Sequence, residues 1–286
     1  MTAVSPPRAI WLRFRTISAR YYYFLSALLC YGLVRRHEVR HLKISAGTKR
    51  GCLVIAPMTH ASIRRVVVHL HGMGDNKWRA FRDGIGVFPQ RFGAILVVPD
   101  LRDSPWCSDR MLVDLESLLS HLHRSYPHAA IVLSGTSMGG SIALSALTNS
   151  AIREKLSGVI AVSAATRLDQ LLTTTDSESV RGALLASVDH DRDKLRDKSL
   201  HYSIPDISVP VCLLYSAADP VIPSVHLLET ATQLSARGIP LRLVRMDRPR
   251  GHYRPLAAEL CDALSWIHDA ASTRTTGARV TQSSPV

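Results

Sequence analysis

The sequence lacks the cysteine and histidine spacings that hold structural metals or build disulfide frameworks. Its five cysteines are scattered, and no C-x-x-C or His/Cys pairing occurs among its 286 residues. We therefore expect no zinc site, no disulfide framework and no cofactor, and a reducing location such as the cytoplasm is the simpler inference. Cys52 and Cys212 lie in apolar runs, where free thiols are usually buried.

The sequence also lacks a convincing membrane span or signal peptide. The apolar segment 21–34 has fourteen residues and is bracketed by Arg20 and the pair Arg35-Arg36. A membrane-spanning helix needs about 20 residues, and no small-x-small cleavage site follows the segment. Three interpretations stay open: a helix packed on the rest of the protein, a helix on a membrane surface, and an uncleaved anchor.

Acidic residues are nearly missing from the first 65 positions. This part has twelve Arg and Lys residues and one acid, Glu38, so eleven charges of the formal net +12 lie there. The rest of the chain is nearly neutral and has no nucleic-acid-binding motif, which argues against nucleic acid as a partner. Basic residues beside Trp11, Phe14 and the tyrosines 21–23 suit an anionic membrane surface instead, and predict peripheral membrane association.

Short continuous apolar runs alternate with helical patterns along most of the chain. Such runs are typical of strands that are buried on both faces of a parallel sheet. The expected strands are 39–45, 53–56, 66–70, 94–98, 131–133, 159–162, 211–215 and 241–244, and the expected helices are 109–124, 141–150, 224–237 and 256–270. The alternation predicts an α/β protein with a doubly wound, mostly parallel sheet.

One pentapeptide lies between a predicted strand and a predicted helix. The apolar run 131–134 leads into Gly-Thr-Ser-Met-Gly, which matches G-x-S-x-G, and the helical pattern 141–150 follows. A strand, a tight turn and a helix form the context in which this motif presents a nucleophilic serine. Only residues without a bulky side chain fit two positions before and after Ser137, which explains Gly135 and Gly139.

Candidate partners for this serine follow later predicted strands. Asp219 follows the apolar run 211–215, and His252 follows the run 241–246. Upstream, the loop 71–75 reads His-Gly-Met-Gly-Asp and also follows a strand. A serine, then an acid after one strand, then a histidine after the next is the triad order of one large hydrolase fold.

With these motifs in this order, the chain resembles an α/β-hydrolase over roughly residues 52–270. The resemblance implies a catalytic triad in which Ser137 is the nucleophile, His252 the general base and Asp219 the acid that orients the imidazole. Asp169, after the preceding strand, is the competing acid, at a position that a minority of the superfamily uses.

The resemblance also implies an oxyanion hole made of the backbone amides of Met73 and Met138. The loop around Met73 resembles the His-Gly-x-Gly-Asp of esterases and acyl-thioesterases. The absence of a His-Gly-Gly-Gly run argues against the hormone-sensitive-lipase branch. We expect His71 to brace this turn rather than to titrate, and Trp78 and Trp106 to contribute to an apolar pocket.

Three domain boundaries follow. We expect residues 1–50 to hold the basic, apolar N-terminal segment and the first edge strand, and 51–270 to form the hydrolase domain, with antiparallel opening strands. Strand-helix alternation breaks between 164 and 209, so we expect a small helical lid there, as in hydrolases with an insertion at this position. Residues 271–286 are expected to form a flexible C-terminal tail.

The predicted function is a serine hydrolase that cleaves carboxylic esters through an acyl-enzyme on Ser137, with a small-molecule ester or acyl compound as substrate. Thioesterases, lipases, acyltransferases and serine peptidases use the same machinery and stay open, because the fold does not choose among them. A non-catalytic hydrolase-fold binding protein is the rival from another class. Such proteins usually lose a triad member, whereas all three residues are present here.

Overall fold

The structure is a computed structural model of the chain. It describes residues 37–42, 51–57, 63–78, 85, 92–101, 106–246, 251–252 and 257–280. The N-terminal segment with its apolar run 21–34, and with it the predicted membrane association, lies outside the described residues.

A single eight-stranded sheet forms the centre of the described chain, in the order β1-β2-β4-β3-β5-β6-β7-β8. Its strands are β1 (His37–Leu42), β2 (Cys52–Pro57), β3 (Arg65–Leu70), β4 (Ile95–Pro99), β5 (Ala130–Thr136), β6 (Gly158–Val162), β7 (Val211–Tyr215) and β8 (Leu241–Arg245). The pairs β1/β2 and β2/β4 are antiparallel, and all the other pairs are parallel. The predicted mostly parallel sheet with antiparallel opening strands is therefore confirmed.

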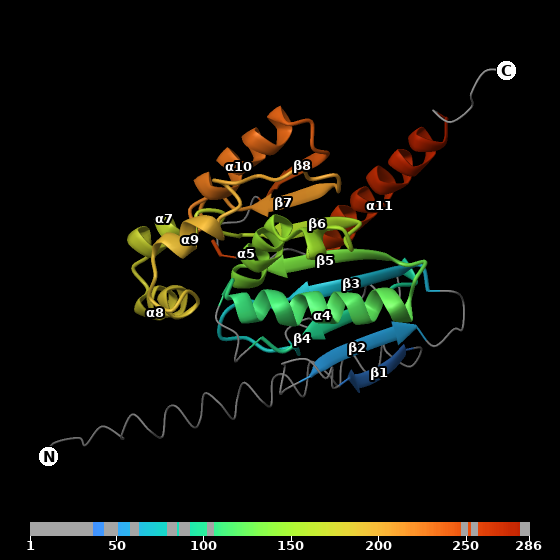
Figure 1. Ribbon diagram of the computed structural model, residues 1–286, viewed down its shortest axis with the longest axis horizontal. Helices are drawn as coiled ribbons and strands as arrows, with labels where there is room; N and C mark the ends of the chain where they lie inside the picture. Colours follow the sequence, from blue (N-terminus) through green and yellow to red (C-terminus); the bar gives the residue numbers. More distant parts are fainter. Residues whose placement is uncertain are drawn as a thin grey trace, which may run out of the picture.

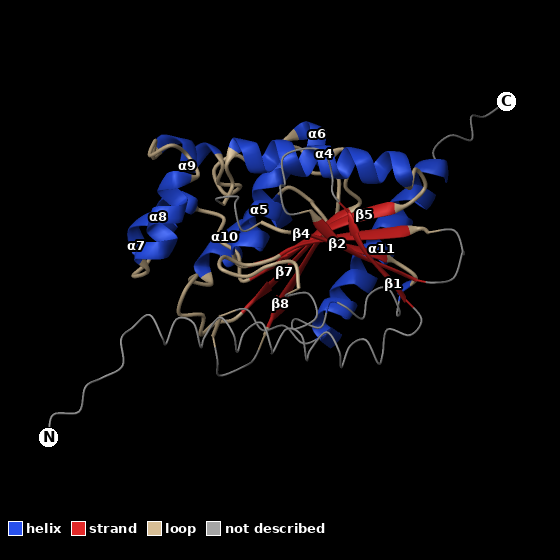
Figure 2. Ribbon diagram, turned by 90° about the horizontal axis from the view of Figure 1, so that it is seen from below, coloured by secondary structure: helices blue, strands red, loops and turns tan. Residues whose placement is uncertain are grey.

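Helices cover both faces of this sheet (Figures 1 and 2). They are α4 (Asp109–Ser125), α5 (Met138–Ser145), α6 (Ser150–Arg153), α7 (Leu168–Thr174), α8 (Glu178–Ala186), α9 (Asp193–Asp197), α10 (Val225–Ala236) and α11 (Ala257–Val280), with a 3₁₀ turn η2 (Ala146–Thr148). Alternate side chains of β3 point to opposite faces. Val66 and Val68 join a core with α4, α5 and α10, whereas Val67 joins a second core with α11.

Two helices differ from their predicted bounds. The helix expected over 141–150 is divided into α5, η2 and α6, because the Asn149 side chain accepts a hydrogen bond from Ile152 N (3.2 Å) and caps a new helix. The helix expected to end at 270 continues to Val280 as part of α11. The first part of the predicted tail 271–286 is therefore helical up to Val280, and the flexibility of this tail stays a prediction.

The interval 164–209 contains three helices, α7, α8 and α9, between β6 and β7. Figure 1 shows them grouped beyond the ends toward which β5 and β7 point. Their apolar side chains, including Leu171, Leu184 and Leu195, belong to the same core cluster as α4 and α5. This insertion is thus packed into the fold at the edge where parallel α/β sheets bind ligands.

Candidate active site

Ser137 occupies the sharp turn between β5 and α5. Its backbone has φ of 56° and ψ of −119°, in a region that residues with a side chain rarely adopt. The turn is held at both sides: Ser137 N donates to Val162 O (2.8 Å), and Ser137 O accepts from Ser141 N (2.9 Å). The Ser141 hydroxyl also donates to Ser137 O (3.2 Å).

The two glycines of the motif are required by close backbone contacts. A Cβ atom added to Gly135 would lie 2.2 Å from Gly139 O, and one added to Gly139 would lie 2.0 Å from Leu70 O. Both distances are far below van der Waals contact, so neither position accepts a side chain without movement of the backbone. The predicted reason for these glycines is confirmed.

The structure brings Ser137, His252 and Asp219 together. His252 Nε2 lies 2.8 Å from Ser137 Oγ, and His252 Nδ1 lies 2.9 and 2.8 Å from the two carboxylate oxygens of Asp219. With the carboxylate as acceptor, Nδ1 carries the proton and donates it, and Nε2 is left to accept from the serine hydroxyl. This is the geometry that a Ser-His-Asp relay requires.

Backbone hydrogen bonds hold the Asp219 carboxylate in place independently of its contact with His252. Its Oδ1 accepts hydrogen bonds from Val221 N (2.9 Å) and Ile222 N (3.0 Å), and its side chain is only 2% exposed. Two backbone donors stabilise the ionised form of a buried carboxylate. The competing acid, Asp169, instead accepts a hydrogen bond from the Tyr202 hydroxyl (3.0 Å).

The residue before His252 allows the histidine loop to approach the acid loop. A Cβ atom added to Gly251 would lie 2.4 Å from Pro220 Cδ and 3.1 Å from Ala218 O. The glycine therefore lets the two loops touch, which brings the imidazole within reach of the carboxylate.

The predicted oxyanion loop lies against the nucleophile. A Cβ atom added to Gly72 would lie 3.7 Å from Ser137 Cβ. Met138 is the first residue of α5, so its amide has no partner within the helix. These positions suit the predicted use of the amides of Met73 and Met138, which stays a prediction.

His71 braces this loop, as predicted. Its Nε2 accepts a hydrogen bond from Leu101 N (2.9 Å), so the ring is neutral and Nδ1 carries the proton that it donates to Gly72 O (2.8 Å). The side chain is buried. The imidazole thus joins the loop after β3 to the chain after β4.

Two contacts at this edge show no signal strong enough to predict them from the sequence. The ammonium of Lys77 lies 3.8 Å from the buried carboxylate of Asp100, so the loop after β3 is joined to the end of β4 by an ion pair. Ser141 Oγ accepts a hydrogen bond from Ala165 N (2.8 Å). This bond connects the insertion to the elbow, which is the turn between β5 and α5 that carries Ser137. The spacing of four residues between Ser137 and Ser141 in a helix was the available signal.

The cysteines and the apolar pocket residues are distributed as follows. Cys52, Cys107, Cys212 and Cys261 are buried, as predicted for Cys52 and Cys212. Trp106 and Met138 are buried, whereas Trp78 is 38% exposed.

Among the described residues, no group of three His, Cys, Asp or Glu side chains could hold a metal ion. No helix there has the length and apolar character to cross a membrane.

A family described as serine aminopeptidase, S33, matches residues 107–189, which include the elbow and most of the insertion. No curated protein matches the sequence.

Solved structures with the same fold include esterases and peptidases. An esterase from Pyrobaculum calidifontis is 17% identical with a TM-score of 0.63, and the match covers 90% of this chain and 92% of that one. Esterase B from Lactobacillus rhamnosis is 13% identical with a TM-score of 0.63, over 93% and 97% of the two chains.

An acylaminoacyl peptidase from Pyrococcus horikoshii is 18% identical with a TM-score of 0.59, over 78% of this chain but 39% of that one. The chain therefore spans about two fifths of the length of that peptidase. The chain thus has the α/β-hydrolase fold that its order of motifs predicted, and the family match includes the turn that carries Ser137.

Proposed function

We propose that the chain is a serine hydrolase that cleaves carboxylic esters through an acyl-enzyme on Ser137. The distance of 2.8 Å between Ser137 Oγ and His252 Nε2 carries this proposal, since a serine hydroxyl is a poor nucleophile without a base in contact. Asp219, hydrogen-bonded to the other imidazole nitrogen, supports the same assignment.

In the proposed first step, Ser137 Oγ attacks the carbonyl carbon of the ester while His252 Nε2 takes the hydroxyl proton. The carbonyl oxygen becomes an oxyanion between the amides of Met73 and Met138. When the intermediate collapses, the bond to the leaving alkoxide breaks and His252 returns the proton to it, which releases an alcohol.

In the second step, water attacks the acyl-enzyme. His252 takes a proton from the water, the second tetrahedral intermediate forms in the same oxyanion site, and the proton passes to Ser137 Oγ as the carboxylic acid leaves. Asp219 stays ionised and stabilises the imidazolium in both steps. The net reaction consumes one water and produces one acid and one alcohol.

Hydrolysis of an amide or peptide bond is the second candidate, because the matched family is described as serine aminopeptidase and one structural neighbour is an acylaminoacyl peptidase. Coverage favours the ester: the chain matches 92% of the Pyrobaculum esterase but 39% of the peptidase. Thioesters and acyl transfer to other alcohols use the same acyl-enzyme.

A fluorophosphonate probe tests the nucleophile directly. We expect the wild-type protein and the surface control Ser150→Ala to be labelled, and Ser137→Ala to remain unlabelled. Matched ester, thioester and amide substrates with one common acyl group then rank the leaving groups. A protein that folds but is neither labelled nor active on any of them would support the non-catalytic binding protein.

A further inference from the structure

Hydrogen bonds join the two ends of the helical insertion to each other, next to the points where it leaves and rejoins the sheet. His201 N donates to Thr166 O (3.2 Å), and Leu168 N donates to the Ser199 hydroxyl (2.8 Å). The segment around residue 167 leaves β6, and the segment around residue 201 returns toward β7. The insertion therefore has a closed base made of two stems.

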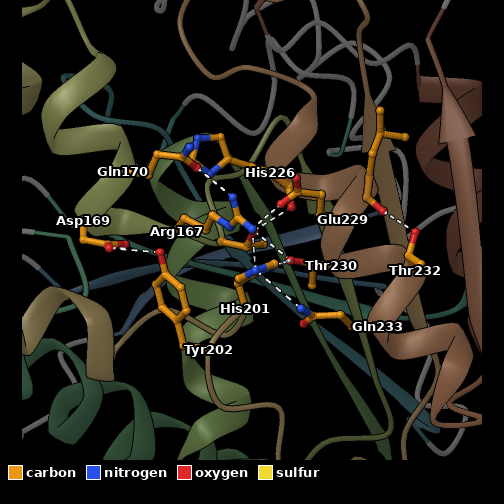
Figure 3. A network of polar contacts seen from close by, with 12 residues as sticks. Arg167, Asp169, Gln170, His201, Tyr202, His226, Glu229, Thr230, Thr232 and Gln233 are labelled. Atoms are coloured by element: carbon orange, nitrogen blue, oxygen red, sulfur yellow. Dashed lines mark hydrogen bonds and ion pairs between the residues drawn. The ribbon is translucent and has the colours of Figure 1, made fainter.

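A polar cluster, here called the stem clamp, attaches this base to α10. It consists of Arg167 and His201 from the stems and Glu229 and Thr230 from α10 (Figure 3). The Arg167 guanidinium lies 2.6 Å from His201 Nε2 and forms an ion pair with the Glu229 carboxylate. Figure 3 shows Arg167 between the other stem and α10.

The hydrogen bonds of the stem clamp run in one direction. A guanidinium can only donate, so His201 Nε2 accepts, the ring is neutral, and its proton is on Nδ1. Nδ1 faces the Thr230 hydroxyl (3.4 Å), which donates to the Thr166 hydroxyl (2.9 Å), which in turn donates to His226 O (2.7 Å). The chain of bonds is complete only while His201 is uncharged.

The stem clamp is connected to both sides of the proposed triad. On one side, Ala165 N donates to the Ser141 hydroxyl, which donates to Ser137 O. On the other side, α10 follows directly after the loop in which Ile222 N binds Asp219. The insertion is thus fixed relative to the nucleophile and the acid through the same few residues.

Several charged and titratable groups face His201. Burial lowers the pKa of His201, the Arg167 guanidinium lowers it further, and the carboxylates of Glu229 and Asp169 oppose this. The neighbouring His226 is buried, which lowers its pKa to about 4. Tyr202 donates to Asp169 and has the Arg196 guanidinium 4.3 Å above its ring, and burial raises its pKa.

We infer that Arg167 and His201 are positioning residues that hold the helical insertion closed at the carboxyl edge of the sheet. There they control how tightly long acyl chains bind beside Ser137. The part concerning acyl groups rests on the proposed function. Protonation of His201 removes the acceptor of Arg167 and brings two positive charges together, so it opens the clamp.

The direction of the pH effect follows from the lowered pKa of His201. An unfolded or opened chain binds a proton near the ordinary histidine pKa of 6.5, whereas the closed clamp resists it. The closed state is therefore fully stabilised above about pH 6.5. This stabilisation decreases as the pH falls toward the pKa that His201 has in the closed clamp. Burial lowers the pKa of His226 to about 4, well below the ordinary histidine value of 6.5 at which the pH effect begins.

Hydrogen exchange of the full-length protein tests the clamp without relying on catalysis. We expect His201→Leu and Arg167→Met to speed amide exchange in residues 168–200 by at least about tenfold, with the sheet unchanged. His201→Gln keeps an acceptor for Arg167 but cannot titrate, so it should behave like the wild type at about pH 7.5. His123→Gln and Arg124→Met, both exposed on α4, are the matched controls.

A pH series separates the clamp from simple packing. Between about pH 7.5 and 4.5, exchange of 168–200, corrected for its intrinsic rate, should rise in the wild type and stay level in His201→Gln. Equal pH dependence in the two proteins, or wild-type exchange in His201→Leu and Arg167→Met, overturns the inference.

Kinetics with esters of graded chain length test the acyl-group part. We expect His201→Leu to raise KM for long acyl chains by about tenfold while kcat for an acetyl ester changes less than about twofold, with recovery in His201→Gln. Equal changes on long and short esters overturn this part. If no ester is cleaved by the wild type, the proposed function fails, while the exchange result still decides the clamp.

Discussion

At the scale of single residues, the structure distinguishes two aspartates that the sequence left in competition. Asp219 is buried, accepts two backbone N–H groups and contacts His252 with both oxygens. Asp169 lies on the first helix of the insertion and contacts Tyr202. Only one of them can therefore control which nitrogen of the histidine carries the proton.

We predict that Asp219→Asn lowers kcat by about 10³- to 10⁴-fold. The amide nitrogen of the new side chain would donate toward His252 Nδ1 and stabilise the tautomer that cannot accept the serine proton. Asp169→Asn is the matched control and should keep kcat within a few fold, measured on the same ester. The reverse pattern, with activity retained in Asp219→Asn and lost in Asp169→Asn, would assign the acid to the earlier strand.

Ser141 provides a second prediction at this scale. Its buried hydroxyl accepts from Ala165 N and donates to Ser137 O. In Ser141→Ala the buried Ala165 amide loses its partner, which should cost about 1–3 kcal/mol of unfolding free energy. Urea unfolding measures this loss, with the exposed Ser150→Ala as control. Loss of activity without loss of stability would mean that the hydroxyl acts on the elbow alone.

At the scale of the elements, glycines with contrasting surroundings make a direct test of the strand-turn-helix geometry. Gly135→Ala places a Cβ atom 2.2 Å from Gly139 O, against backbone that cannot move without displacing Ser137. We expect a loss of at least about 1–3 kcal/mol in unfolding free energy, together with a fall in fluorophosphonate labelling.

Gly182→Ala is the control for this change. Gly182 lies inside α8, and a Cβ atom there would meet nothing within 4 Å. The substitution should stabilise the protein by about 0.5–1 kcal/mol, because alanine favours the helix and restricts the unfolded chain. Equal effects of the two substitutions on stability would show that the contact between the two glycines is not needed for the fold.

The elements differ in how well their sequence predicted them. Strands such as 211–215 and 159–162 were predictable to within a residue, because a buried parallel strand is a short continuous apolar run. The division of 141–150 was not, since it depends on the Asn149 cap, which competes locally with a continuous helical pattern. The three residues of the proposed triad were predictable from motif order, but their contacts were not.

The clamp at the base of the insertion illustrates what sequence reasoning could not find. Arg167, His201 and Glu229 come from three separate segments and show no motif or periodicity. Their meeting depends on how the two stems return to α10. The choice between Asp219 and Asp169 depended on the same three-dimensional arrangement.

At the scale of the whole molecule, the burial of the cysteines predicts that their thiols react slowly with alkylating reagents in the folded protein. Burial raises the pKa of Cys52, Cys107 and Cys212 to about 12. At about pH 8 only about one thiol in 10⁴ would be ionised, and thiolate is the reactive form. A Cys30→Ser protein keeps only the four cysteines that are buried in the structure. It should therefore resist iodoacetamide when folded and react with it at these four cysteines in urea. Rapid labelling of the folded protein would mean that the core opens locally.

The charge of the molecule is as unevenly distributed as its thiols. Eleven charges of the formal net +12 lie in residues 1–65, the part of the chain that also holds the apolar run 21–34. Most of residues 1–65, and the whole of this run, lie outside the described residues. Each Lys or Arg close to an anionic bilayer contributes about 1 kcal/mol of attraction. Half of these residues, with Trp11, Phe14 and the tyrosines at the interface, would be sufficient for reversible binding.

We therefore predict that the full chain co-sediments with vesicles containing anionic lipid, and that a protein beginning at His37, which keeps β1, does not. Because charges on a surface are screened over about 8 Å at physiological salt, added salt should weaken the binding of a surface helix and leave an inserted one bound. If the full chain ignores vesicles and the shortened protein unfolds, the segment is instead a packed helix of the fold. That outcome would also give the N-terminal aromatic residues a role in covering the sheet.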